Sequence, residues 1–325
     1  MTTEPTPGTA GWPPPVLDPA GPFAGPIEVV AWVLFVMAAV VMTVVLIALG
    51  IALFGPRRWK RRVSGERLVW IGGLAFPIVV LTGLLIYGLT TTARVAEAPR
   101  PGEMRVRVTG EMWWWRVAYL DDRGREILQD ANEVHIPAGQ PVVFELESAD
   151  VIHSFWVPRL GGKTDMIPGR RNFMRLQADQ PGTYGGQCAE YCGGPHALMG
   201  LVVVAHTPQD FAAWRGRQAG PAVALDAAAP TAAMIARGRD VFAASGCGAC
   251  HTIRGTEANG LAGPDLTHVG SRQTIGAGLL PNNQGTLAGW ISDSQGIKPG
   301  NRMPSYPVLT GQDLRAVSAY LDGLK

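Results

Sequence analysis

The sequence predicts a multidomain chain: a two-helix transmembrane hairpin, then an all-β sandwich, then an all-α domain. Three observations predict this fold class. Two long apolar runs occupy the N-terminal part, short alternating runs separated by turn residues follow them, and the C-terminal part has helical spacing. A chain of 325 residues is long enough for two or three domains. The formal net charge of +2 gives no reason to expect nucleic acid as a partner.

The two apolar runs predict transmembrane helices at about residues 27–54 and 68–92. Each exceeds the roughly 20 residues that a helix needs to cross a hydrocarbon core of ~30 Å, and Pro77 predicts a kink in the second helix. The first run is longer than the roughly 7–15 apolar residues of a signal-peptide core and follows no basic residue, so we expect it to be retained.

The segment between the runs is strongly basic, and it carries Arg57, Arg58, Lys60, Arg61, Arg62 and Arg67 against Glu66. Such a cluster holds a loop in the cytoplasm, so both termini and the soluble domains are expected on the extracytoplasmic side. Residues 1–26 are rich in Pro, Gly and Thr and predict a flexible extracytoplasmic leader. The hairpin then covers residues 27–93.

Residues 94–210 have the pattern of an all-β domain. Alternation at residues 104–109 and apolar runs at residues 142–146 and 201–205 predict strands, and turn residues such as Gly124 and Gly139 separate the strand-like segments. Many short strands with regular turn signals are typical of a sandwich or a barrel. An Ala-, Gly- and Pro-rich composition predicts a linker at residues 211–233, which leaves residues 234–325 as a second soluble domain.

A cluster of metal-binding residue types begins at Cys188, where the chain reads Cys-Ala-Glu-Tyr-Cys-Gly-Gly-Pro-His-Ala-Leu-Met. Cys188, Cys192, His196 and Met199 share this short loop, and His153 upstream offers a second imidazole. Soft sulfur and imidazole donors with a weak thioether select copper that is used for electron transfer. A mononuclear blue-copper site would leave one cysteine surplus, and a zinc site is disfavoured because methionine is a poor zinc ligand.

A second motif, Cys-Gly-Ala-Cys-His at residues 247–251, is typical of covalent haem c attachment. Cys247 and Cys250 would bind the haem vinyl groups, His251 would be the proximal iron ligand, and Met303 would be the sixth ligand. A thioredoxin-like pair would need a βαβ pattern, and no other cysteines remain to complete a zinc cluster, because the second pair lies in the Cys188–Met199 loop. Four cysteines could also form two disulfides, but the histidine and methionine near each pair argue against that reading.

These motifs and the hairpin together resemble cytochrome c oxidase subunit II of the CuA-containing haem-copper oxidases, in the form with a fused C-terminal cytochrome c domain. The resemblance implies a cupredoxin-like Greek-key sandwich that holds a dinuclear CuA centre. The copper ligands that it implies are the bridging thiolates of Cys188 and Cys192, the imidazoles of His153 and His196, the weak ligand Met199 and the backbone carbonyl of Glu190.

The same resemblance assigns roles to two further residues. The side chain of Glu190 would bind magnesium or manganese at the interface with subunit I, a role that suits a hard oxygen ligand. The block Gly-Glu-Met-Trp-Trp-Trp, which ends at Trp115, matches an aromatic block of the family, so Trp113 would be the residue at which electrons arrive. Taken alone, the run predicts a strand in which Trp113 and Trp115 pack on one face and Trp114 lies on the other.

The C-terminal domain resembles class I cytochromes c. The resemblance implies that the carbonyl of Pro264 accepts the Nδ1 proton of His251. It also implies that Gly238 and Phe242 pack the first helix of the domain on its last, which helical spacing predicts over residues 314–324. The remaining histidines have no partner pattern and are interpreted as surface or packing residues: His135, His206 and His268.

The resemblance implies an electron-transfer subunit of a respiratory oxidase in the bacterial cell (inner) membrane. Electrons from an upstream cytochrome c or bc1 complex would reach the haem, then CuA through Trp113, then subunit I, where oxygen is reduced to water and protons are translocated. This chain would hold no catalytic residue, because the oxygen-reducing site lies in subunit I. The expected partners are subunit I, subunit III and membrane lipid.

The same residues bear on three alternative functions. The donor subunit of a CuA-containing nitric oxide reductase would carry a similar module, and this alternative stays open. A quinol oxidase subunit II would lack the copper ligands, and a membrane-anchored electron carrier would need only one helix. The sequence departs from the family near the start of the second helix, where Glu66 is the nearest candidate for a carboxylate that opens a proton channel.

Overall fold

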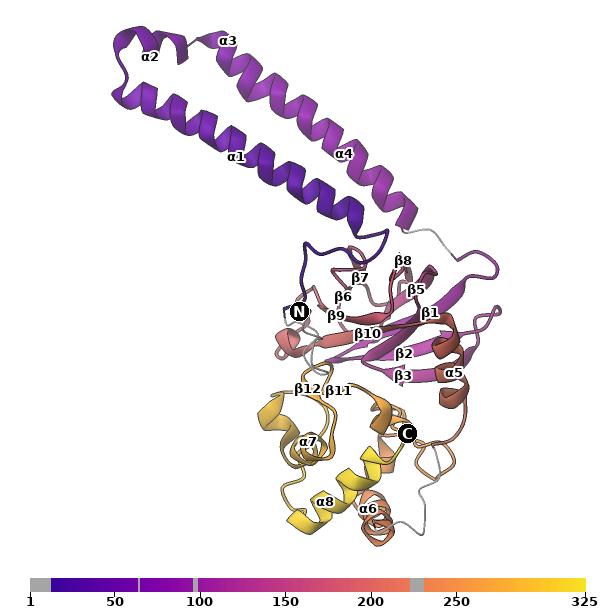
Figure 1. Ribbon diagram of the computed structural model, residues 1–325. Coiled ribbons are helices and arrows are strands. Elements are labelled where there is room, and N and C mark those ends of the chain that lie inside the picture. Colours follow the sequence, from indigo (N-terminus) through magenta and orange to yellow (C-terminus); the bar gives the residue numbers. More distant parts are fainter. Residues whose placement is uncertain (1–12, 64, 96–98, 223–230) are drawn as a thin grey trace, which may run out of the picture. The chain divides into compact units, whose positions relative to one another are not determined.

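A computed structural model of the chain describes residues 13–63, 65–95, 99–222 and 231–325. It divides into two units (Figure 1). One unit is Gly25–Glu97, and the other contains the soluble domains together with the segment that precedes Gly25. The predicted class is confirmed: two apolar N-terminal helices, a β-sandwich and a helical C-terminal domain follow one another along the chain.

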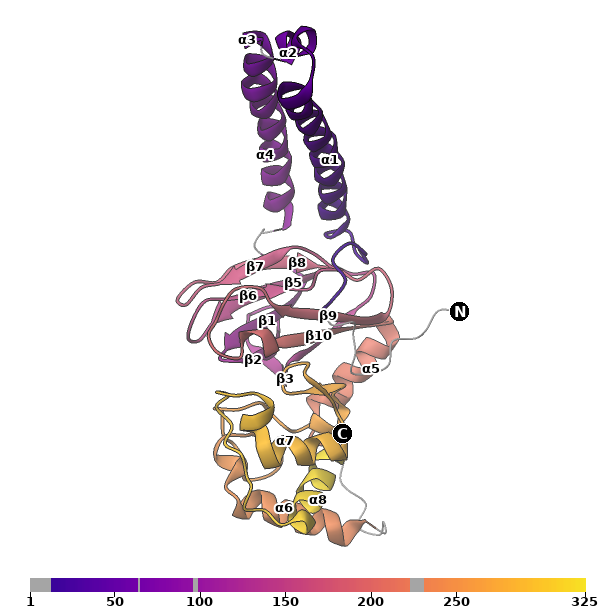
Figure 2. The same ribbon diagram turned by 90° about the vertical axis from the view of Figure 1, so that its left-hand side faces the viewer.

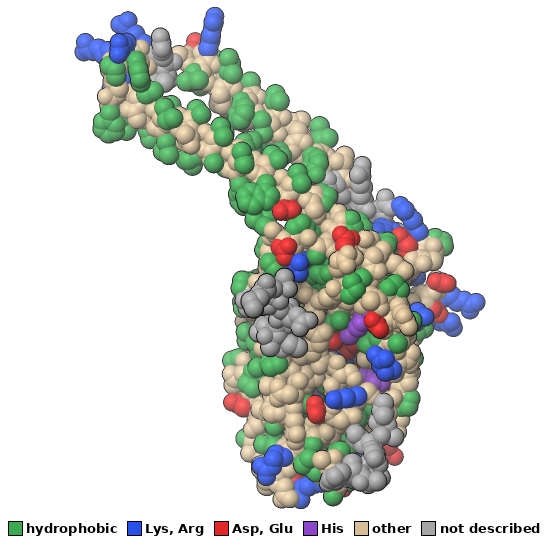
Figure 3. All heavy atoms as spheres, viewed as in Figure 1, with side chains coloured by type: hydrophobic (Ala, Val, Ile, Leu, Met, Phe, Trp, Pro, Cys, Tyr) green, Lys and Arg blue, Asp and Glu red, His purple; other side chains and the backbone are tan. Residues whose placement is uncertain are grey.

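The first unit is a helical hairpin. Its elements are α1 (Gly25–Phe54), α2 (Arg57–Val63), α3 (Glu66–Leu68), the π-helical turn η1 (Val69–Ala75) and α4 (Phe76–Val95). Two spans, Gly25–Phe54 and Glu66–Thr90, are long and apolar enough to cross a membrane. Figure 3 shows apolar side chains along both spans and basic side chains at the end that carries α2. The segment expected to be a basic loop is therefore partly helical.

Pro77 lies inside the second span, as the second residue of α4. A proline ring clashes with the carbonyl four residues earlier and removes a backbone donor. The chain responds with the wider turn η1, in which the Phe76 amide donates to the carbonyl of Ile71. The kink predicted at Pro77 thus takes the form of a π-helical turn. At the start of the same span, Glu66 accepts a hydrogen bond from Trp70 Nε1 at 3.3 Å.

The β domain is a sandwich of two five-stranded sheets, with strand orders β3-β2-β1-β5-β8 and β4-β10-β9-β6-β7. The strands are β1 (Met104–Glu111), β2 (Trp114–Leu120), β3 (Glu126–Ala131), β4 (Glu133–Pro137), β5 (Val142–Ser148), β6 (His153–Trp156), β7 (Lys163–Met166), β8 (Asn172–Leu176), β9 (Gly182–Cys188) and β10 (Gly200–His206). Val108, Phe144 and Leu146 are among the fully buried side chains of its core. The three strands expected from apolar runs are β1, β5 and β10, and Gly124 and Gly139 have the positive φ that their turns require.

A helix follows the sandwich directly. α5 (Pro208–Ala219) begins at Thr207, whose side chain caps it, and buries Phe211 and Trp214. The Trp214 ring stacks on the His135 ring with centroids 4.2 Å apart. The linker expected over residues 211–233 therefore begins later than its composition indicates, because two aromatic residues attach its first part to the sandwich. Residues 223–230 of that expected linker lie outside the described residues.

The last residues before the hairpin also differ from the flexible leader that their composition predicts. The Ala20 amide donates to the carbonyl of Arg159, and the Ala20 carbonyl accepts from the Asp179 amide. Arg159 forms an ion pair with Asp18 at 2.9 Å. Two backbone hydrogen bonds and a charge pair hold residues 18–20 against the sandwich, whereas residues 1–12 lie outside the described residues.

The C-terminal domain is mainly helical. Its elements are α6 (Ala232–Ala244), the 3-10 turns η3 (Cys247–Ala249) and η4 (Val269–Ser271), the short strands β11 (Thr274–Ile275) and β12 (Leu280–Pro281), α7 (Gln284–Ile297) and α8 (Gly311–Asp322). Figure 2 shows α6 and α8 side by side. They touch at Gly238, where a Cβ would lie 2.0 Å from the Ala316 carbonyl oxygen, and Phe242 packs on Tyr320. The expected packing of the first helix on the last is confirmed, with glycine at the closest approach.

Candidate metal centres

Four of the expected copper ligands lie on the connection between β9 and β10. Cys188 ends β9, and a 3-10 turn (η2, His196–Leu198) folds the rest of the loop back over it. His153 begins β6, which pairs with β9 so that Phe155 is opposite Cys188. The sulfur atoms of Cys188 and Cys192 lie 3.8 Å apart. The other separations are 3.9 Å from Cys188 Sγ to His153 Nδ1, 3.5 Å from Cys192 Sγ to His196 Nδ1 and 3.9 Å from Cys192 Sγ to Met199 Sδ.

The chemistry of this donor set fits a metal centre. The Cys192 thiol donates to Cys188 and so lowers the pKa of Cys188 to about 3, while that contact and burial raise the pKa of Cys192. Two thiolates this close repel each other in a buried site, so both ionise together only when cations lie beside them. Cys188, Cys192, His153 and Met199 are all buried, so the cluster is closed to solvent on most sides.

Asp150 orients the first imidazole, and the sequence reading missed it. Its Oδ1 accepts a hydrogen bond from His153 Nε2 at 2.9 Å, which leaves His153 Nδ1 unprotonated and facing Cys188. Its Oδ2 accepts from the Met112 amide at 2.8 Å. The signal was present in the sequence, because Asp150 stands three residues before the ligand in Asp-Val-Ile-His.

Replacing Asp150 with asparagine should weaken copper binding by about 10–100-fold, the usual effect of removing a carboxylate behind a ligating histidine. The amide either loses the hydrogen bond or turns a donor toward the imidazole, which disfavours the required tautomer. The effect is measured as the amount of copper that the protein retains when the chelator concentration is increased. Asp122→Asn removes the same charge from an exposed turn and should leave retention unchanged; equal retention in both variants would exclude an orienting role.

The backbone carbonyl and the side-chain carboxylate of Glu190 point to different places. Its backbone carbonyl lies 3.2 Å from Cys188 Sγ, inside the thiolate cluster. Its carboxylate lies outside, 3.6 Å from Lys163 Nζ. Within the described ranges, the residues grouped for metal binding are His153, Cys188 and Cys192, with no further carboxylate gathered around Glu190. The expected magnesium or manganese site therefore gains no support and stays a prediction.

The residues expected to hold haem line one cavity of about 350 Å³, which is bounded mainly by the C-terminal domain and also by sandwich residues such as Trp113 and Trp114. Cys247, Cys250, His251 and Met303 all reach it. His251 Nδ1 donates to the Pro264 carbonyl at 2.8 Å, as the resemblance implies, which leaves Nε2 free to bind iron. Apolar side chains of the domain core, including Leu287, Ile291 and Val317, complete the wall. The donor set, the apolar lining and the fixed tautomer fit a haem c.

Two observations refine this second site. All four cysteines of the chain carry free thiols, which excludes the two-disulfide reading. Trp290 Nε1 donates to Met303 Sδ at 3.2 Å, and Ser294 Oγ donates to the Met303 carbonyl. Both donors come from α7, so this helix orients the methionine, a contribution that the sequence did not reveal.

Trp113 lies between the two groups of ligands. It precedes β2, so the alternation expected for three strand tryptophans is wrong: Trp115 alone is buried, and its Nε1 donates to the Gly200 carbonyl. Trp113 Nε1 donates to the Cys192 carbonyl at 2.9 Å. Its ring also lines the cavity that contains Met303. One side chain therefore touches both the copper loop and the haem cavity.

The three remaining histidines lie away from both sites. His135 and His206 stack with Trp214 and are joined by a hydrogen bond of 2.7 Å. His268 lies 3.2 Å from Arg254. Their interpretation as packing residues agrees with these contacts.

Comparison with known proteins gives matches along most of the chain. Residues 118–206 match the family model of the periplasmic domain of cytochrome c oxidase subunit II, and residues 235–325 match that of cytochrome c. A protein of Alkalihalophilus pseudofirmus named cytochrome c oxidase subunit 2 is 37% identical over 95% of this chain and 90% of its own length. One of the same name from Bacillus sp. strain PS3 is 30% identical over 82% of this chain and 76% of its own.

Among solved structures, the periplasmic domain of subunit II of cytochrome oxidase from Bradyrhizobium japonicum is 29% identical in the matched part. The match has a TM-score of 0.34 and covers 38% of this chain and 96% of that one.

Proposed function

We propose a route for electrons through this chain, which belongs to the cytochrome c oxidase subunit 2 family and is thus a subunit of an oxidoreductase. Electrons arrive at a haem c held by Cys247, Cys250, His251 and Met303. They pass Trp113 to a dinuclear CuA centre and continue to subunit I, where oxygen is reduced to water and protons are translocated. The CuA ligands in this proposal are His153, Cys188, Glu190, Cys192, His196 and Met199.

The observation that carries the proposal is the position of Trp113. Its indole N–H is hydrogen-bonded to the copper loop at Cys192, and its ring is part of the cavity wall that Met303 also lines. When bound, the haem and the copper pair each supply a one-electron redox centre. The ligands named above would hold the haem in the cavity and the copper pair at the Cys188–Met199 loop, and Trp113 contacts both places. Both centres would serve electron transfer rather than bond chemistry.

The membrane hairpin and the basic segment support the proposed location and orientation in the membrane; the electron donor and the magnesium or manganese site are proposed from the family alone. The two apolar spans anchor the chain in the bacterial cell (inner) membrane, in contact with lipid, subunit I and subunit III. The arginines and lysine of α2 lie on the cytoplasmic side, which puts both termini and the soluble domains outside. An upstream cytochrome c or bc1 complex donates the electrons. Magnesium or manganese bound by the Glu190 carboxylate, together with subunit I, completes the interface.

A Trp113→Leu variant of the complete oxidase tests the route. Removal of the ring opens a gap between the cavity and the copper loop and deletes the hydrogen bond to Cys192. We expect the haem-to-copper rate to fall at least about tenfold, or about 1.4 kcal/mol of activation free energy. The rate is followed by rapid absorbance measurements after the haem is reduced under anaerobic conditions, with the spectra of both centres as a check that they are intact.

Trp114→Leu is the matched control, because the neighbouring ring also lines the cavity but stacks on Arg116, 4.7 Å away. This variant should transfer electrons at the normal rate. An unchanged rate in Trp113→Leu, or an equal loss in both variants, would remove Trp113 from the route.

The terminal acceptor is tested on the purified complex. Oxygen uptake driven by reduced cytochrome c is the expected activity. Consumption of nitric oxide without oxygen uptake would instead identify the donor subunit of a CuA-containing nitric oxide reductase. The relatives named above are cytochrome c oxidase subunits, which favours oxygen.

A further inference from the structure

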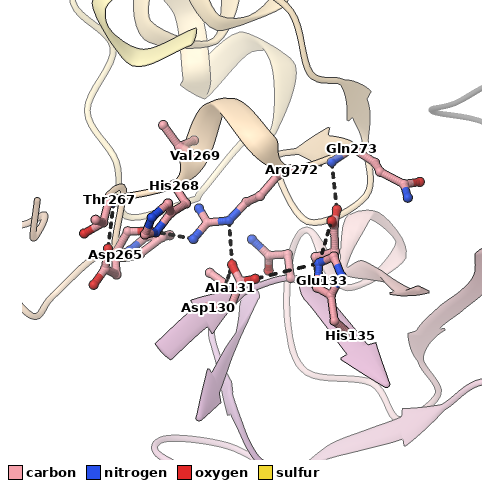
Figure 4. Close-up of polar contacts among 12 residues, drawn as sticks. Asp130, Ala131, Glu133, His135, Asp265, Thr267, His268, Val269, Arg272 and Gln273 are labelled. Carbon is pink, nitrogen blue, oxygen red and sulfur yellow. Dashed lines mark hydrogen bonds and ion pairs between the residues drawn. The ribbon is translucent and has the colours of Figure 1, made fainter. Parts of the chain in front are cut away.

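Several polar contacts join the C-terminal domain to the sandwich, among them a hydrogen bond from the Gly200 amide to the Ala277 carbonyl. Three of them involve a buried charged side chain, and we call these three the junction. Arg272 Nε donates to Asp130 Oδ1 at 2.7 Å, and the Gln273 amide donates to Glu133 Oε2 at 2.8 Å (Figure 4). The third contact is made by Lys298, whose Nζ donates to the Trp113 carbonyl at 2.7 Å. The junction thus consists of Arg272, Gln273 and Lys298 on the C-terminal domain and Asp130, Glu133 and Trp113 on the sandwich.

The first contact is an ion pair closed to water. The side chains of Arg272 and Asp130 are 8% and 3% exposed. Arg272 also donates to the Asp265 carbonyl within its own domain, which fixes the guanidinium before it meets the carboxylate. Asp130 Oδ1 also accepts from the Ala131 amide at 2.8 Å, and Oδ2 lies 4.0 Å from His135 Nε2 without a hydrogen-bond partner among the described residues. The Arg272 guanidinium is therefore the nearest charged group to this buried carboxylate. Loss of either partner leaves an uncompensated charge in the junction.

In the second contact, the Glu133 carboxylate is held in place by His135 of its own domain. Glu133 is 1% exposed, and its Oε1 accepts from His135 Nε2 at 3.0 Å while Oε2 accepts the Gln273 amide. His135 is fixed in turn by its stack on Trp214 and its hydrogen bond to His206. Figure 4 shows Glu133 between His135 of the sandwich and Gln273 of the C-terminal domain. Because both domains orient the Glu133 carboxylate, this contact favours one position of the C-terminal domain relative to the sandwich.

The third contact is a buried ammonium. Lys298 is 2% exposed, and its Nζ bridges the Trp113 carbonyl of the sandwich and the Gly276 carbonyl of its own domain at 2.7 and 3.0 Å. Among the described residues these carbonyls are its acceptors, and it forms no ion pair. Burial lowers the pKa of Lys298 to about 7. A desolvated amine is retained at such a place only where hydrogen bonds compensate it, and one of these two goes to the main chain of Trp113.

We propose that Lys298 is a positioning residue for electron transfer, which fastens the main chain of Trp113 to the C-terminal domain while the Arg272–Asp130 pair fixes the same domain in one docked position. This inference rests on the proposed function, because Trp113 matters as a bridge only if electrons pass it. It adds that transfer from haem to copper needs no docking step. Because buried contacts are screened little by salt, the native rate should not depend on ionic strength.

A Lys298→Met variant of the full chain in its oxidase complex tests the inference. Methionine keeps the length of the apolar stem and removes the two hydrogen bonds. We expect the haem-to-copper rate to fall about tenfold, the change in docked population that corresponds to about 1.4 kcal/mol, and to become dependent on salt. Hydrogen–deuterium exchange should rise in the peptides that contain residues 113–116 and 272–276. Lys325→Met, which removes an exposed lysine of the same domain, should change neither quantity.

Asp130→Asn provides an independent test, because this residue does not line the haem cavity. Asp130→Asn should raise hydrogen–deuterium exchange in the same peptides and slow electron transfer from haem to copper. If Lys298→Met loses its haem or copper spectrum, the result for Asp130→Asn decides the test. Unchanged exchange and an unchanged, salt-independent rate in variants with intact cofactors would overturn the inference. The proposed function fails separately, if the wild-type complex lacks either redox centre or if Trp113→Leu transfers electrons normally.

Discussion

Replacing Cys192 with serine is expected to abolish the dinuclear copper signal and to lower oxygen consumption more than about a hundredfold, or about 2.7 kcal/mol of activation free energy. Cys192 Sγ lies within 4 Å of three other donor atoms: Cys188 Sγ, His196 Nδ1 and Met199 Sδ. A serine oxygen is a hard donor that cannot replace a thiolate between two soft metal ions. Electron paramagnetic resonance of the oxidised complex and an oxygen electrode measure the two effects.

The haem site provides the internal control for this variant. Cys247 and Cys250 lie in the other domain, so the c-type haem band should persist and the haem should remain reducible. Tyr191→Phe, which changes an exposed neighbour on the same loop, should keep both copper and activity. If Cys192→Ser retained the copper signal, the second bridge would have to be another residue, and the set of six ligands would be wrong.

Both ligand groups were accessible to sequence reasoning because most of their members are close in the chain. A loop that contains Cys188, Cys192 and His196 cannot separate them far, and Cys247, Cys250 and His251 fall within one turn. His153 was harder, since it joins the others only through the pairing of β6 with β9. It was found because a copper site of this donor type needs a second imidazole, rather than from spacing.

The junction could not have been predicted in the same way. Its contacts join residues 142, 140 and 185 positions apart, and each member is of an ordinary surface type. Asp130 and Glu133 look like solvated strand acids, and Lys298 looks like the exposed end of a helix. Only the docked domains reveal that all three are buried. Composition failed for a related reason at residues 211–219, where Phe211 and Trp214 gain a surface to pack on that a linker would not have.

Replacing Met303 with alanine is expected to stop transfer at the haem and to lower cytochrome-c-driven oxygen consumption more than about a hundredfold. A thioether ligand raises the reduction potential of a haem, and its loss lowers that potential. A hundredfold shift of the one-electron equilibrium away from copper needs a change of about 120 mV. A potentiometric titration of the haem band measures this shift directly.

The control is Met234→Ala on α6, because Met234 does not line the cavity and its loss should leave the potential unchanged. The copper signal should persist in both variants, since none of its donor atoms is altered. An unchanged potential in Met303→Ala would mean that another group binds the iron opposite His251. The hydrogen bond from Trp290 to Met303 Sδ would then hold a packing residue rather than a ligand. A lowered haem reduction potential together with slow electron transfer from haem to copper would instead show two requirements of the route. It would depend on the haem potential that Met303 sets as well as on the position of Trp113.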